Sequence, residues 1–133
     1  MLKAKQAKEI VVRLENGSDP LAKFSRIVAE RGINALALCT WVEDGRCVVR
    51  LLTDDTLRTA DLLREHAYDF KTLDVVTVNA PHKPGILQRI AQTLAAENVG
   101  VSHLFATAGL DQAECLVVLN TSDNARAIVL LNR

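Results

Sequence analysis

The chain has 133 residues, of which 49% are hydrophobic and 24% are charged. This length is enough to bury the core of one ordinary domain or of two very small ones, and the composition is too apolar for a disordered chain. Its 16 basic and 16 acidic side chains balance and only five residues are aromatic, so the basic surface and stacking rings of a nucleic-acid binder are missing. No apolar run reaches the roughly 18 residues of a membrane span, and three widely spaced cysteines are typical of a reduced, cytoplasmic protein.

The first half of the chain predicts six elements in the order strand, helix, strand, strand, helix, strand. Residues 9–15 alternate between apolar and polar side chains, which is the period of a strand, and Asp44-Gly45 is the signal of a hairpin turn. Ser18 or Asp19 is expected to cap the first helix, with Pro20 in its first turn. The expected ranges are 9–15, 18–32, 33–42, 46–53, 53–64 and 69–73.

The second half repeats the pattern of the first. A shift of 66 residues superposes the apolar positions of 10–38 on those of 76–104, and a shift of 68 then superposes 47–62 on 115–130. Matched cysteines, caps and arginines in the same register argue against a chance match of apolar residues. The elements expected in this second copy are 74–80, 84–97, 101–107, 113–120 and 122–131.

The two copies predict an α+β fold of two tandem ferredoxin-like βαββαβ units, each with one sheet and two helices on one of its faces. The first unit is expected over residues 1–73 and the second over 74–133. No segment after the last helix matches 69–73, so the second unit is expected to lack its closing strand unless a neighbouring molecule or the arm of residues 1–8 supplies it.

Catalytic chemistry has no support in the sequence, and we expect no catalytic residue, metal or cofactor. The three histidines are scattered, and no GxSxG, HExxH, CxxC or phosphate-loop motif occurs. Cys47 and Cys115 stand at equivalent places in apolar strands and are expected to be small core residues. His66, at a helix end, is expected to be structural, and His103, on a strand, to lie at the surface or in an interface.

Residues 75–106 read VVTVNAPHKPGILQRIAQTLAAENVGVSHLFA: a strand, a loop ending in Pro-Gly, an apolar helix, and a strand after a turn rich in Gly, Val and Asn. This segment resembles the ACT-domain family, and residues 8–39 resemble it more loosely. The likeness extends over residues 8–133 and is greatest to small tandem ACT proteins with no attached enzyme. It implies allosteric sensing of amino acids by a module that binds the ligand and oligomerises.

The loop before the first helix of the second copy is the candidate ligand site. Gly85 lets a ligand approach the backbone, and free N–H groups at the helix start favour a carboxylate. Lys83 adds a cation, and His82 and Asn79 can supply directional hydrogen bonds, although His82 could also be a solvated loop residue. The candidate ligand-binding residues are Asn34, Asn79, His82, Lys83, Pro84, Gly85, Ile86 and Leu87.

Asn34 joins this set through the family resemblance. ACT sites commonly form between two units, one giving this loop and the other an Asn at the start of its second strand. The second copy has the loop but Gly100 in place of the Asn, whereas the first copy has Asn34 but Ser18-Asp19 in place of Pro-Gly. The resemblance therefore implies one competent site, loop 79–87 with Asn34, within one chain or between two, and one degenerate site.

The leading hypothesis is a non-catalytic regulatory protein that binds an amino acid between ACT-like units. The alternative is an ACT-like assembly or docking module for a partner enzyme or regulator, with no small-molecule ligand. Strands 33–42 and 46–53 are apolar on both faces while helices cover one face, so we also expect a homodimer or higher oligomer. We expect neither a nucleic-acid nor a membrane partner.

Overall fold

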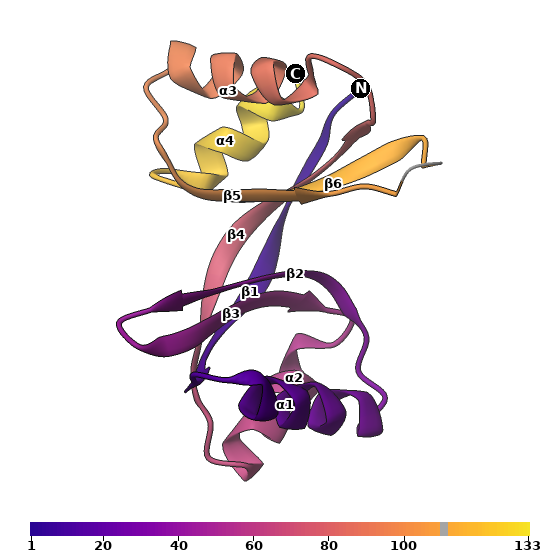
Figure 1. Ribbon diagram of the computed structural model, residues 1–133. Helices are drawn as coiled ribbons and strands as arrows, with labels where there is room; N and C mark the ends of the chain where they lie inside the picture. The colour runs from indigo at the N-terminus through magenta and orange to yellow at the C-terminus, as the bar shows by residue number, and fades with distance from the viewer. Residues whose placement is uncertain (110–111) are drawn as a thin grey trace. The chain divides into compact units, whose positions relative to one another are not determined.

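The computed structural model describes residues 1–109 and 112–133, in which helices are separated by single strands and by pairs of consecutive strands (Figure 1). The elements are β1 (Lys3–Glu15), α1 (Ser18–Glu30), β2 (Ala35–Glu43), β3 (Arg46–Thr53), α2 (Thr56–Glu65), β4 (Asp69–Pro81), α3 (Ile86–Ala96), β5 (Val101–Thr107), β6 (Glu114–Thr121) and α4 (Asn124–Leu131). They form two compact units, here called the first unit (Lys8–Leu73) and the second unit (Met1–Ala7 with Asp74–Arg133). β1 and β4 each contribute one end to each unit.

The first unit has the ferredoxin-like arrangement that the sequence predicts. Its strands lie in the order β2-β3-β1-β4, with β3 antiparallel to both of its neighbours, and Figure 1 shows α1 and α2 on one face of this sheet. Alternate residues of a strand point to the same face, so Ile10, Val12 and Leu14 share a core with Phe24 of α1 and Leu62 of α2. The predicted α+β class is confirmed.

Two helices begin differently from the prediction. α1 begins at Ser18, and its N-cap is Gly17 with φ 135°, so neither Ser18 nor Asp19 caps it. α3 begins at Ile86, two residues after the expected start, because its N-cap Gly85 has a left-handed backbone with φ 93°. Both differences have one cause: glycine reaches positive φ at little cost, and it sets the chain direction before the first helical residue.

The N-terminal arm completes the second unit. The strand order there is β1-β4-β6-β5, so the first residues of β1 take the place that residues 69–73 have in the first unit. Leu2 and Ala4 are buried in the core under α3 and α4, and the backbone of Ala4 exchanges two hydrogen bonds with the Asn132 side chain, at 2.7 and 2.8 Å. The expected division into 1–73 and 74–133 is therefore wrong for the first seven residues. Of the two sources predicted for the closing strand, the arm supplies it.

The repeat holds at the level of strand register. Leu14 of β1 lies opposite Cys47 of β3, and Ala80 of β4 lies opposite Cys115 of β6, the partners that shifts of 66 and 68 residues require. Cys47 is buried and Cys115 partly buried, each packed with the core of its own unit. The two cysteines therefore occupy matching sites, as predicted.

Helix capping repeats in the same way. The Asp55 side chain accepts the backbone N–H of Arg58 at the start of α2, and Asp123 accepts that of Arg126 at the start of α4, both at 3.0 Å. Each cap satisfies one N–H group that the first helical turn leaves without an intrahelical partner. The 68-residue shift thus superposes these side-chain contacts as well as the strands.

The sheet face of the first unit that points away from its helices is already buried in a single chain. Val11, Val48 and Leu52, which alternate with the core residues of β1 and β3, are 2%, 1% and 6% exposed. Exposed apolar residues of this sheet include Leu36, Leu38 and Val42 on the edge strand β2.

Candidate functional site

Backbone contacts fix the loop between β4 and α3. β4 ends at Pro81, and the next residue, His82, donates its backbone N–H to the carbonyl of Ala113 at 2.9 Å. Gly85 makes the turn into α3, and within the described part of the chain no side-chain hydrogen bond caps the start of this helix. The first N–H groups of α3 are therefore available to an acceptor outside the helix. They begin at Ile86 and not at Pro84, where the sequence suggested that the helix starts.

A cavity of about 350 Å³, here called the loop cavity, lies between this loop, α3 and the β5–β6 hairpin of the second unit. Small-molecule pockets have volumes of about 300–1,000 Å³. Four of the predicted site residues line it: His82, Lys83, Ile86 and Leu87. Asn79, Pro84 and Gly85 lie in or next to the loop but are not part of the lining.

The other residues that line the loop cavity come from the β5–β6 hairpin, and the sequence analysis did not predict them as site residues. These residues are Leu104, Ala106, Thr107, Ala108, Cys115 and Val117. The repeat carried a signal that could have found them: Ala106 and Ala108 stand where the first copy has Thr40 and Val42. Smaller side chains at the end of β5 leave space beside α3.

Gly85 is required for its backbone conformation and not for space. A Cβ built there would meet no other atom within 4 Å, while its φ of 93° is one that side chains rarely adopt. Replacing Gly85 by valine should therefore cost about 1–3 kcal/mol of unfolding free energy and displace Lys83 from the helix start. Replacing it by asparagine, which tolerates positive φ, should cost clearly less in the same urea titration. Equal stability of the two variants would contradict this explanation.

Asn34 belongs to the first unit and follows α1. Its backbone is held by two hydrogen bonds to Asp54: its N–H donates to the Asp54 carboxylate at 3.0 Å, and its carbonyl accepts the Asp54 N–H at 3.1 Å. Gly100 is held in the same way by Ser122, at 2.9 and 2.8 Å. The Asn34 side chain is exposed on a fixed backbone, and it is not among the residues that line the loop cavity.

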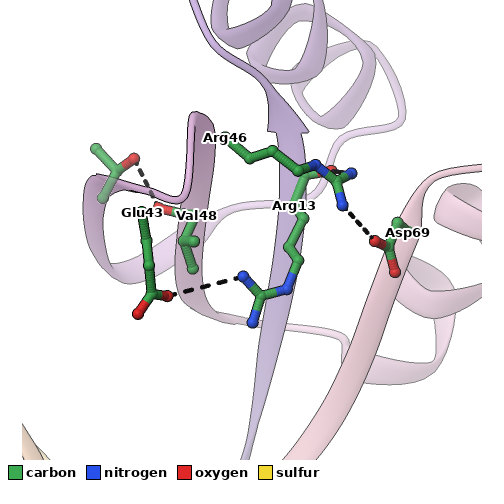
Figure 2. A network of polar contacts seen from close by, with 6 residues as sticks. Arg13, Glu43, Arg46, Val48 and Asp69 are labelled. Carbon is green, nitrogen blue, oxygen red and sulfur yellow. Dashed lines mark hydrogen bonds and ion pairs between the residues drawn. The ribbon is translucent and has the colours of Figure 1, made fainter.

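A second cavity, of about 510 Å³, lies at the start of α1 in the first unit. Its lining includes Asp19 and, from other elements, Arg13, Arg46, His66 and Asp69. Figure 2 shows Arg46 directed at Asp69, 2.9 Å away, and Arg13 directed away toward Glu43, at 3.8 Å. The two arginines are thus neutralised by acidic side chains, so this cavity is poorly suited to a free carboxylate.

The first unit also contains a buried ion pair outside both cavities. Glu9 of β1 is fully buried, and its Oε1 accepts a hydrogen bond from Nη1 of Arg50 at 2.7 Å. The Arg50 guanidinium lies 5.8 Å from the centre of the Trp41 ring, a cation–π distance. Burial raises the pKa of Glu9 above its ordinary value, while Arg50 acts in the opposite direction. The buried Oε2 of Glu9 and Nε of Arg50 make no hydrogen bond within the described part of the chain.

Metal-binding clusters and membrane-spanning helices are both absent from residues 1–109 and 112–133. No group of three or more His, Cys, Asp or Glu residues is placed there to hold a metal ion. None of the helices described is long and apolar enough to cross a membrane.

No protein-family model matches the chain, and neither does any curated protein. Among solved structures, protein BT0572 from Bacteroides thetaiotaomicron is 26% identical, with a TM-score of 0.89 over 98% of this chain and 89% of that chain. The aspartokinase α and β subunits are 16% identical, with a TM-score of 0.66 over 98% of this chain and 94% of that one. The regulatory subunit of aspartate kinase from Thermus thermophilus, in its ligand-free form, is 12% identical, with a TM-score of 0.67 over the same shares.

Proposed function

We propose that this chain, which has the tandem ACT-domain fold of the aspartate kinase regulatory subunits, is a non-catalytic regulatory protein that binds a free amino acid in the loop cavity. The observation that carries the proposal is the composition of this cavity, which combines cationic groups and an uncapped helix start with apolar walls. The bound amino acid would change the assembly of the chain with itself or with a partner enzyme or regulator in the cytoplasm.

The end of the loop cavity that is formed by the loop and the start of α3 is suited to a carboxylate. The first N–H groups of α3 and the positive end of its dipole attract an anion, and the exposed Lys83 ammonium adds a full charge. Each charge-assisted hydrogen bond contributes about 1.5–3 kcal/mol. Two or three of them, less the cost of ordering the ligand, correspond to Kd values of about 1 μM to 1 mM, the range that suits a metabolite sensor.

The names of the structural neighbours support a regulatory role. The Thermus thermophilus protein is a regulatory subunit, and the Clostridium acetobutylicum aspartate kinase, of which this chain covers 33%, is described as an allosteric enzyme. At identities of 12% and 17% these proteins share a fold with this chain, so the ligand has to be inferred from the loop cavity itself.

A second copy of the chain is the proposed partner in assembly. Leu36, Leu38 and Val42 on the edge strand β2 are 51%, 48% and 57% exposed, and β2 has a free hydrogen-bonding edge. An exposed apolar edge strand is a template for pairing with another chain. We propose that this pairing produces a homodimer or higher oligomer and that Asn34 of one copy completes the loop cavity of the other.

The proposal is tested by thermal unfolding of the protein in the presence of each of the twenty amino acids. Selective binding to the folded state raises the melting temperature, and the stabilisation grows with the logarithm of one plus the ratio of ligand concentration to Kd, so at least one amino acid at millimolar concentration should raise it. The alternative, a docking module without a small-molecule ligand, predicts the same melting temperature in all twenty solutions. That result would overturn the proposed function.

Replacing Asn34 by alanine should weaken amino-acid binding without unfolding the protein. The loss of one hydrogen bond costs about 1–2 kcal/mol, or about 5–30-fold in Kd. Stability should be retained because Asp54 holds the backbone of residue 34 and not its side chain. The measurement is calorimetric titration with the amino acid that gives the largest thermal shift. Unchanged affinity would contradict a role for Asn34.

A mixing experiment tests whether the two halves come from different copies. Asn34→Ala impairs one half of the proposed site, and Lys83→Ala impairs the other. Mixed dimers should contain one site with both halves intact, so unfolding and refolding the two variants together should restore binding to a fraction of the chains. A mixture that binds no better than either variant alone would contradict the two-copy arrangement.

A further inference from the structure

The charged and apolar residues of the loop cavity are segregated. The cationic Lys83 and the polar His82 lie next to each other in the loop. The walls consist of the hairpin residues already named and of Ile86 and Leu87 on α3, which are apolar except for Thr107. A zwitterion placed with its carboxylate at the loop would therefore direct its side chain into an apolar space.

Among residues 1–109 and 112–133, no acidic side chain lines the loop cavity. An amino acid with a cationic side chain would bury an ammonium or guanidinium group without a counter-ion, which is strongly unfavourable. An acidic side chain would bury a second carboxylate away from Lys83, at the apolar end. An aliphatic side chain has no such cost, because it exchanges water for contacts with carbon atoms.

The comparison of the two copies gives an independent reason for this selectivity. In the first copy, the Thr40 hydroxyl donates to the carbonyl of Val48 at 2.9 Å and lies 3.2 Å from the sulfur of Cys47. The second copy has Ala106 at the position of Thr40, so this hydroxyl is missing beside Cys115. The smaller Ala106 side chain enlarges the cavity and makes its wall less polar.

We propose that the amino acid bound in the loop cavity has an uncharged aliphatic side chain, which lies against Leu104, Ala106 and Val117. This inference rests on the proposed function, because it assigns the class of ligand to the same site. It makes the β5–β6 hairpin the determinant of specificity, while the loop recognises the carboxylate that all amino acids share.

Calorimetric titration of the full chain with L-isoleucine, L-alanine, L-lysine and L-aspartate tests the class of ligand. Isoleucine should bind roughly tenfold or more tightly than lysine or aspartate, because a buried unpaired charge or a few buried methylene groups changes affinity by at least that factor. Alanine should bind more weakly than isoleucine. Lysine or aspartate binding most tightly would overturn the inference and leave the proposed function standing, whereas no binding by any amino acid would overturn the proposed function as well.

The variant Ala106→Leu tests the position of the side chain. Ala106 is exposed at the rim, so the larger residue should be tolerated while it fills part of the cavity. Isoleucine affinity should fall by roughly tenfold, and alanine affinity by much less, because only the longer side chain reaches the hairpin. The matched control is Thr40→Leu, at the equivalent position of the first copy, which should leave both affinities unchanged. An equal loss for isoleucine and alanine, or no loss for either, would overturn the placement.

Discussion

Replacing Leu2 by aspartate should destabilise the second unit by at least about 3 kcal/mol, although the change lies one residue from the start of the chain. Leu2 is 5% exposed and belongs to the same core cluster as Val76 of β4, Ile90 of α3 and Leu130 of α4. The substitution removes a buried aliphatic side chain and places a carboxylate among apolar residues.

The neighbouring substitution Lys3→Asp is the matched control. Lys3 is the first residue of β1 and is exposed, whereas Leu2, directly before it, is buried. Its replacement should change the unfolding free energy by less than about 0.5 kcal/mol. Urea titration followed by circular dichroism measures both variants. If Leu2→Asp is as stable as Lys3→Asp, the arm does not complete the second unit in solution.

The sequence predicted most of the local structure because the signals were local. The Asp44-Gly45 turn has positive φ at both residues, 52° and 75°, as the dipeptide indicates for a tight hairpin. The repeat then transferred the assignment of the first copy to the second. The N-cap of α1 and the start of α3 were predicted wrongly because a glycine N-cap has no side chain for a sequence pattern to reveal.

The partner of the N-terminal arm could not be predicted with the same certainty, because it depends on a contact between residues 128 positions apart. Ala4 pairs with Asn132, and nothing within either segment specifies the other. The arm sequence KAKQAKE gives little strand signal by itself, and its strand is stabilised by the sheet that it joins.

The candidate site was predicted in part for a related reason. Pro84-Gly85 and Lys83 belong to one contiguous loop, so the sequence could bring them together. The opposite wall of the loop cavity lies on the β5–β6 hairpin, about twenty to thirty residues further along the chain. The space beside this wall results from hairpin residues that are smaller than their counterparts in the first copy. Small side chains form no recognisable sequence motif. Only the comparison of Thr40 with Ala106 could have indicated the cavity.

Replacing Arg50 by methionine should destabilise the first unit by about 3–5 kcal/mol near pH 7.5, because it leaves the carboxylate of Glu9 buried and without its ion-pair partner. Arg46 provides the matched control on the same strand. Its ion pair with Asp69 is largely exposed, with side-chain exposures of 44% and 62%, so Arg46→Met should cost no more than about 1 kcal/mol. Thermal and urea unfolding of the two variants should therefore differ clearly.

The pH dependence of Arg50→Met gives a sharper test, since burial raises the pKa of Glu9 and Arg50 is the group that opposes this shift. Without Arg50 the pKa of Glu9 in the folded state should rise further above its unfolded value. A raised folded-state pKa contributes stability that is fully present below the unfolded pKa and is lost as the pH rises through the folded pKa. The deficit of Arg50→Met relative to the unmodified protein should therefore shrink as the pH is lowered from 7.5 toward 5. The double variant Glu9→Gln/Arg50→Met has no carboxylate at this position, so it should be more stable than Arg50→Met at pH 7.5, and the difference between these two variants should shrink as the pH is lowered toward 5. A deficit for Arg50→Met that is constant across this range would show that the lost interaction is packing against Trp41 and not the charge of Glu9.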